Sequence, residues 1–142
     1  MDDPFHLQRF LDAQDPVYTR VLAELRSGRK STHWMWFIFP QLRGLGNSRT
    51  ASEFAISSRA EAEAYWNHPV LGPRIRECAG LVNRIEGRTI EEIFAYPDHL
   101  KFRSSVTLFR EIAPGERVFH DALEKYFAGI AEPRTLGLLE GL

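Results

Sequence analysis

Signals that begin and end helices recur at short intervals along this 142-residue chain. Asp3-Pro4 and Asp15-Pro16 each place a capping acid before a proline, which suits the first turn of a helix. Ser58 and Thr89 are each followed three residues later by a glutamate, which is the capping-box pattern. Gly28 is typical of a helix end. A chain divided in this way is expected to fold into several short helices.

Apolar side chains recur at helical spacing between these signals, as Val17, Val21 and Leu25 do. No long segment alternates strictly between apolar and polar residues, as half-buried strands do. We therefore predict an all-α (mainly α) fold. Residues 1–142 are expected to form a single compact domain of about seven to nine short helices with orthogonal or irregular packing. The last substantial helix should end near Gly129.

Three further caps lie near the segments that carry candidate chemistry. Ser31 or Thr32 is expected to cap a short helix that ends before Pro40, because proline disfavours helical geometry at the residue preceding it. Ser48 and Asp98 are expected to cap the helices that follow them.

The composition is that of a folded globular protein, with 44% hydrophobic, 26% charged and 12% aromatic residues. The longest apolar run, residues 34–39, is far shorter than the ~20 residues that cross a bilayer, so no membrane partner is expected. The acidic start, Met1 to Pro4, lacks the basic and apolar regions of a secretory signal. A lone cysteine, Cys78, fits a reducing compartment, and we expect a soluble, cytoplasmic protein.

The charge is unevenly distributed. The whole chain carries a net charge of −1, which does not favour nucleic acid as a partner. Between Arg20 and Arg49, however, six basic residues stand against Glu24 alone, a local excess of +5. A small anionic molecule is the partner that this stretch favours.

Several familiar chemistries are excluded by inspection. The string Gly28-Arg29-Lys30-Ser31 lacks the spacing of a phosphate-binding P-loop, and neither a Gly-x-Ser-x-Gly elbow nor a His-Glu-x-x-His motif is present. The five histidines are scattered, and no pair has the spacing of metal ligands on a helix. No metal site, cofactor or catalytic residue can therefore be assigned from the sequence.

Two segments remain as candidates for a binding site. In the first, residues 30–48, indoles could stack on a planar ligand while basic and hydrogen-bonding residues hold an anion. The alternative is that the aromatic run forms the centre of the core. In the second segment, Lys101 and Ser104 share one face of a helix, for which the alternative is a solvated face. The predicted ligand-binding residues are Lys30, His33, Trp34, Trp36, Gln41, Arg43, Ser48, Lys101 and Ser104.

The string GRKSTHWMWFIFPQ at 28–41, followed by GLGNS at 44–48, resembles the signature of the domain of unknown function 1810 family. Stretches at 68–74 and 101–105 extend the similarity. The resemblance implies a compact, mainly α-helical domain found chiefly in bacteria, and it brings no established activity or catalytic residue. Family members are often labelled calpastatin, but calpastatin is a long disordered inhibitor, whereas this chain has the aromatic content of a folded domain.

The leading hypothesis is a ligand-binding domain, with enzymatic activity left open, whose aromatic and basic pocket takes a small anionic or nucleotide-like molecule. The alternative is a non-catalytic protein-interaction module in which part of the aromatic stretch is exposed. The first hypothesis requires the two candidate segments to line one hollow.

Overall fold

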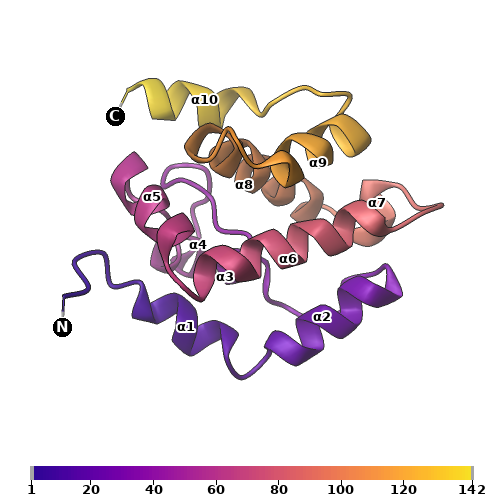
Figure 1. The fold of residues 1–142 in the computed structure, drawn as a ribbon, viewed down its shortest axis with the longest axis horizontal. Helices are drawn as coiled ribbons and strands as arrows, with labels where there is room; N and C mark the ends of the chain where they lie inside the picture. The colour runs from indigo at the N-terminus through magenta and orange to yellow at the C-terminus, as the bar shows by residue number, and fades with distance from the viewer. Residues whose placement is uncertain (1, 142) are drawn as a thin grey trace.

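The computed structural model describes residues 2–141, which form ten α-helices around one hydrophobic core (Figure 1). In chain order they are α1 (Gln8–Gln14), α2 (Tyr18–Ser27), α3 (Met35–Ile38), α4 (Arg49–Glu53), α5 (Arg59–Asn67), α6 (Leu71–Arg84), α7 (Ile90–Ile93), α8 (Asp98–Ile112), α9 (Arg117–Phe127) and α10 (Pro133–Glu140). Within these residues the one β pairing is an isolated bridge between Leu42 and Ile56. The all-α prediction is confirmed, and α10 is a helix that the sequence analysis did not anticipate.

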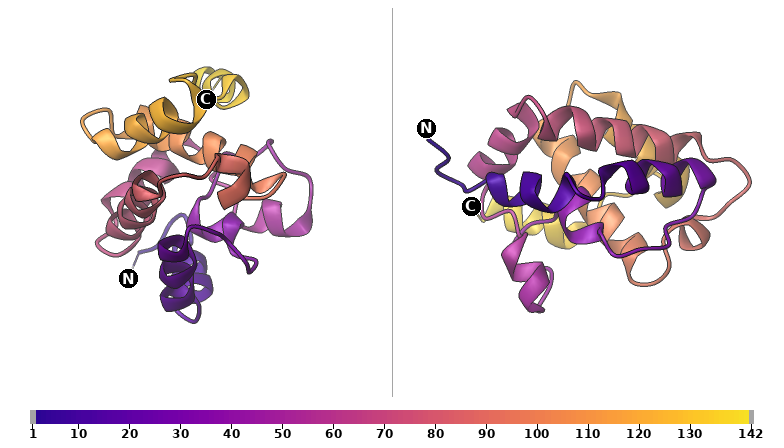
Figure 2. Two further views of the ribbon diagram at one scale, coloured as in Figure 1. Left: turned by 90° about the vertical axis from the view of Figure 1, so that its right-hand side faces the viewer. Right: turned by 90° about the horizontal axis from the view of Figure 1, so that it is seen from below.

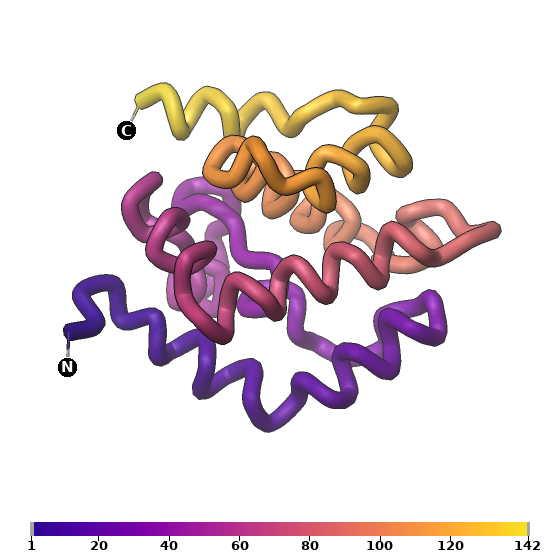
Figure 3. Tube along the Cα trace, in the orientation of Figure 1, coloured from indigo at the N-terminus to yellow at the C-terminus, as the bar shows by residue number. Residues whose placement is uncertain are grey.

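The helices lie in layers that follow the chain from one side of the molecule to the other (Figures 1 and 3). Helices α1 and α2 form the first layer, α5 and α6 cross above them, and α9 and α10 lie on the opposite side, as the turned view in Figure 2 also shows. Helix α8 is central, since it packs against α3, α5, α7, α9 and α10. No helix of the described residues has the length and apolar character needed to span a membrane.

The centre of the core is aromatic. Phe102 of α8 contacts Phe39 and Phe94, with ring centroids 4.9 and 5.1 Å apart, and Trp34 packs edge-on against Phe94. Trp34 and Phe39 are buried, whereas Trp36, between them in the chain, is partly exposed. The aromatic run at 34–39 therefore contributes mainly to the core and leaves Trp36 available to a surface site.

Several predicted helix boundaries are confirmed. Gly28 ends α2 in the left-handed region with φ of 85°, where a side chain would be strained. Thr89 and Glu92 form the complete capping box at α7. The Ser58 hydroxyl accepts a hydrogen bond from the N–H of Glu61, as expected for a cap. The Glu61 carboxylate, however, accepts from the N–H and hydroxyl of Ser57 instead of completing the box.

Other predicted boundaries are wrong, and side-chain hydrogen bonds explain why. The helix expected after Asp3-Pro4 begins only at Gln8, because the Asp3 carboxylate accepts from the N–H groups of Leu7 and Gln8 across an intervening turn. Helix α3 has no side-chain cap, since the Thr32 hydroxyl donates to Glu24. Asp98 is the first residue of α8 and not its cap, and its carboxylate binds lysines.

Candidate functional site

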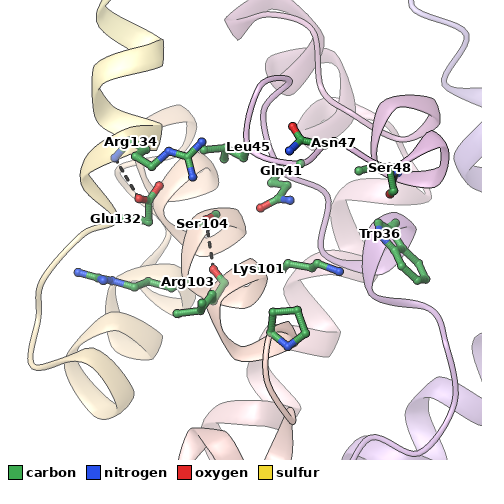
Figure 4. A pocket seen from close by; sticks show the side chains of 14 residues that line it. Trp36, Gln41, Leu45, Asn47, Ser48, Lys101, Arg103, Ser104, Glu132 and Arg134 are labelled. Carbon is green, nitrogen blue, oxygen red and sulfur yellow. Dashed lines mark hydrogen bonds between the residues drawn. The ribbon is translucent and has the colours of Figure 1, made fainter.

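A cavity of about 410 Å³ opens between the segment around α3 and α4, the first turns of α8, and the start of α10 (Figure 4). Its walls come from residues 36–51, 97–104 and 132–134. We call it the Trp36–Lys101 cavity after the two side chains that meet on one wall. Its volume lies within the range of known small-molecule sites, about 300–1,000 Å³.

Five of the nine residues predicted from the sequence line the Trp36–Lys101 cavity, and they come from both candidate segments. They are Trp36, Gln41, Ser48, Lys101 and Ser104. More than 50 residues separate Ser48 from Lys101 in the chain. The two segments lie side by side because the start of α8 packs against α3 through the Phe39–Phe102 contact.

The structure places the other four predicted residues outside the cavity lining. Trp34 is buried in the core, and Lys30 is almost fully buried in an ion pair with Asp98. His33 is exposed on the surface. Arg43 lines a separate hollow near Arg9.

The Glu24 carboxylate determines the path of residues 31–34, which lead into α3. It accepts four hydrogen bonds, from the N–H groups of Ser31 and Thr32, the Thr32 hydroxyl and the Trp34 indole, at 2.5–3.0 Å. Burial opposes ionisation of Glu24, but these hydrogen bonds outweigh that effect and lower its pKa to about 2. The indole of Trp34 is thus held inward, and Trp36, on the opposite side of the same turn, faces the cavity.

Two lysines share one carboxylate behind the cavity wall. Lys30 Nζ lies 2.8 Å from Asp98 Oδ2, and Lys101 Nζ lies 3.5 Å from Asp98 Oδ1. Each ammonium group also lies over an indole ring, with Lys30 5.3 Å from the centroid of Trp34 and Lys101 4.6 Å from that of Trp36. Lys101 is therefore fixed between Asp98 and Trp36 while remaining on the cavity wall.

The start of α10 brings further charge to the opposite wall. Arg103 of α8 donates to the carbonyls of Ile130 and Ala131, at 3.0 and 3.1 Å, and so holds the segment that precedes α10. Arg134 Nη2 donates to the Gly44 carbonyl at 3.2 Å, linking α10 to the loop before α4. Both residues belong to the cavity lining, but Figure 4 shows the Arg103 guanidinium directed away from Lys101.

Glu132 is the carboxylate on this wall. It caps α10 by accepting from the N–H groups of Arg134 and Thr135 and from the Thr135 hydroxyl. Burial opposes its ionisation, but the hydrogen bonds from Thr135 and Arg134 prevail and lower its pKa. Because its oxygens accept these hydrogen bonds, we assign Glu132 a structural role as the cap of α10.

Uncharged polar groups face the cavity from the α3–α4 side. Figure 4 shows the Gln41 amide directed toward the cavity, with Asn47 and Ser48 beyond it. Gly46 allows this loop to lie close to α4, since a Cβ at position 46 would lie 2.8 Å from Ala51 Cβ. The α3–α4 side of the cavity is therefore neutral and carries amides, whereas the cations come from α8 and α10.

The site shows no arrangement for nucleophilic catalysis. The Ser104 hydroxyl donates to the Leu100 carbonyl at 3.1 Å, and among the described residues no basic side chain is hydrogen-bonded to it. Within residues 2–141 no three His, Cys, Asp or Glu side chains gather as a set of metal ligands. The geometry supports binding by charge, stacking and hydrogen bonds.

The family model described as protein of unknown function (DUF1810) matches residues 4–139. The chain belongs to the DUF1810 family. It is also similar to a solved structure, that of the conserved hypothetical protein Rv1873 from Mycobacterium tuberculosis. The two are 55% identical, the match covers 97% of this chain and 99% of that one, and the TM-score is 0.96. No curated protein matches.

Membership of the DUF1810 family confirms the resemblance noted in the sequence and assigns no ligand. Sequence reasoning missed several site residues: Asp98, which reaches the site through its ion pairs, Arg103 of α8, Asn47 of the loop before α4, and Glu132 and Arg134 at the start of α10. For the residues at the start of α10, the sequence did contain a signal of a helix start. Glu132-Pro133 is an acid before a proline, the same pattern that is found near the N-terminus.

Proposed function

We propose that this DUF1810 protein binds a small anionic molecule that carries a planar, nucleotide-like group, and that the ligand occupies the Trp36–Lys101 cavity. The observation that supports this most strongly is the convergence of two distant segments on one concavity. An indole, an amide and a lysine meet there, although they are far apart in the chain.

The two sides of the cavity suit the two parts of such a ligand. The planar group would lie against the part of the Trp36 ring that Lys101 leaves uncovered, with its polar edge toward Gln41 and Asn47. Stacking of a base on an aromatic side chain contributes about 1–3 kcal/mol. The anionic group would lie between Lys101 and Arg134, which come from opposite walls.

Charge alone would not provide useful affinity, because an exposed ion pair contributes only about 0–1 kcal/mol. Lys101 is in a better position, since its side chain is 22% exposed and its ammonium is already held by Trp36 and Asp98. Little conformational entropy remains to be lost when an anion binds. Selectivity for a planar anion then follows from the two contacts acting together.

The proposal is tested by measuring thermal shifts and tryptophan fluorescence with nucleoside mono-, di- and triphosphates and sugar phosphates. We expect Lys101→Ala and Trp36→Leu each to weaken the best ligand by about tenfold or more, through loss of a charged hydrogen bond and of stacking respectively. Arg117→Gln is the matched control, because Arg117 is 79% exposed on α9 and away from the cavity lining.

Binding by the wild type that neither cavity variant weakens would contradict the assignment of the site. A flat response to every anion would contradict the proposed function itself. In that case the better candidates for a contact surface, now with a protein partner, would be Leu100, which lines the cavity and is 44% exposed, and Tyr96, which precedes the lining residue Pro97 and is 79% exposed.

A further inference from the structure

The charges around the Trp36–Lys101 cavity are unbalanced. Within residues 2–141, the charged side chains that line it or belong to the ion pairs that reach it are four cations and two carboxylates. These are Lys30, Lys101, Arg103 and Arg134, and Asp98 and Glu132. The excess is two positive charges, in a chain whose net charge is −1.

Part of this excess is held in partly buried positions, whereas Arg134 is exposed. The side chains of Lys30, Asp98 and Lys101 are 9%, 19% and 22% exposed. Among the ion pairs of the described residues, Lys30 and Lys101 share Asp98 as their one carboxylate, so that group of three is itself left with one positive charge. Charges removed from bulk water interact more strongly with a ligand than exposed charges do.

The negative charges of the two carboxylates are compensated by groups of the protein, which weakens their repulsion of an anionic ligand. Asp98 lies between two ammonium groups, and Glu132 is engaged by the N–H groups at the start of α10. On the opposite side of the cavity, Gln41 and Asn47 add hydrogen-bonding groups without adding charge. A ligand with two negative charges on one group would balance the excess, whereas a single negative charge would leave half of it.

From this balance we infer that the Trp36–Lys101 cavity selects phosphomonoesters in their dianionic form over phosphodiesters and uncharged analogues. The inference rests on the proposed function and specifies its ligand class. A terminal phosphate offers three oxygens, which can meet the ammonium of Lys101 and the planar fork of Arg134 together. A diester has fewer free oxygens and one charge less.

Lys30 acts in this scheme as a positioning residue. It is absent from the cavity lining and contacts Asp98, which in turn holds Lys101. Its effects on affinity are therefore transmitted through charge and through the placement of Lys101. This accounts for a lysine that the sequence singled out and the structure places behind the wall.

The test compares affinities for three compounds with the same base and sugar: AMP, 3′,5′-cyclic AMP and adenosine, with the uridine series as a second set. We expect the monophosphate to bind about tenfold or more tightly than the cyclic diester, and the nucleoside to bind most weakly. Equal affinities for the monoester and the diester would overturn the inference while leaving the proposed function in place. If no compound of either series binds and the wider anion panel is also flat, it is the proposed function that fails.

Lys30→Met tests the positioning role. We expect it to reduce the preference for AMP over cyclic AMP by about fivefold to tenfold while affecting adenosine little, and we expect Lys30→Arg to retain the preference. Arg117→Gln, which removes a distant exposed charge, should change nothing. An unchanged preference in Lys30→Met would overturn the role of Lys30.

If Lys30→Met does not fold, the salt dependence of binding to the wild type gives an independent test of the preference for dianionic ligands. Affinity for AMP should fall more steeply with salt than affinity for cyclic AMP, because more charge is neutralised. Identical salt slopes would overturn the inference.

Discussion

At the scale of single residues, the Glu24 carboxylate fixes the segment that leads into the site. The residue is 7% exposed, and no Lys, Arg or His nitrogen of the described residues forms an ion pair with its carboxylate. Four hydrogen bonds compensate the buried charge and fix residues 31–34. In the sequence Glu24 was only the single acid in a basic stretch, and nothing local revealed that it would accept an indole N–H.

Glu24→Gln is expected to lower the free energy of unfolding by about 2–3 kcal/mol at pH 7, measured by urea denaturation. The pKa of Glu24 falls from 4.5 to about 2 on folding, so the charged form stabilises the fold above pH 4.5. This contribution is lost as the pH falls from 4.5 toward 2. The stability difference between wild type and variant should therefore shrink over that range. An exposed control, Glu63→Gln, should show no such trend; a difference independent of pH would contradict this role.

At the scale of elements, close contact between α5 and α6 depends on one glycine. A Cβ at Gly72 would lie 2.1 Å from the carbonyl oxygen of Trp66, which is backbone and cannot rotate away. Val70 is the N-cap of α6, so the clash falls in the first turn of the helix. The two helices can pack at this distance because position 72 has no side chain.

Gly72→Ala is expected to destabilise the protein by about 2–3 kcal/mol, since α5 and α6 must separate to admit the methyl group. Gly80→Ala, in the same helix, is the matched control. The atom nearest to a Cβ there is Val118 Cγ2 at 4.0 Å, so the better helix propensity of alanine should leave stability unchanged or raised. Thermal unfolding of both variants checks the pair, and equal melting temperatures would rule out the clash.

Local signals predicted most of the helices and few of the contacts between them. The caps at Ser58 and Thr89 and the stop at Gly28 depend on neighbours within a few residues, which the sequence displays. The boundaries at Asp3 and Asp98 could not be read in this way. Their carboxylates bind groups whose position depends on a turn or on a lysine 68 residues away.

At the scale of the whole molecule, the site is built from three parts of the chain that the layered fold brings together. Composition and residue types indicated that Trp36 and Lys101 were candidates. The packing of α8 against α3 places the Lys101 ammonium 4.6 Å from the centroid of the Trp36 ring. The contribution of Arg134 depends on α10 docking on α8, a long-range event without a local pattern. Trp34 and Lys30 are of the same residue types as Trp36 and Lys101, which line the cavity. They differ in the direction of the side chain, which points into the core for Trp34 and behind the cavity wall for Lys30.

The central claim, that the Trp36–Lys101 cavity is a binding site for a planar anion, is tested most directly by mapping NMR chemical shifts during titration with AMP. We predict that the Trp36 indole N–H, the Gln41 side-chain amide and backbone amides at 97–104 and 132–134 shift together and saturate at one ligand concentration. Shifts confined to a second hollow, which Arg26, Arg84 and Arg88 line near Gly28, would contradict it, as would the absence of shifts with AMP and with every other anion of the panel.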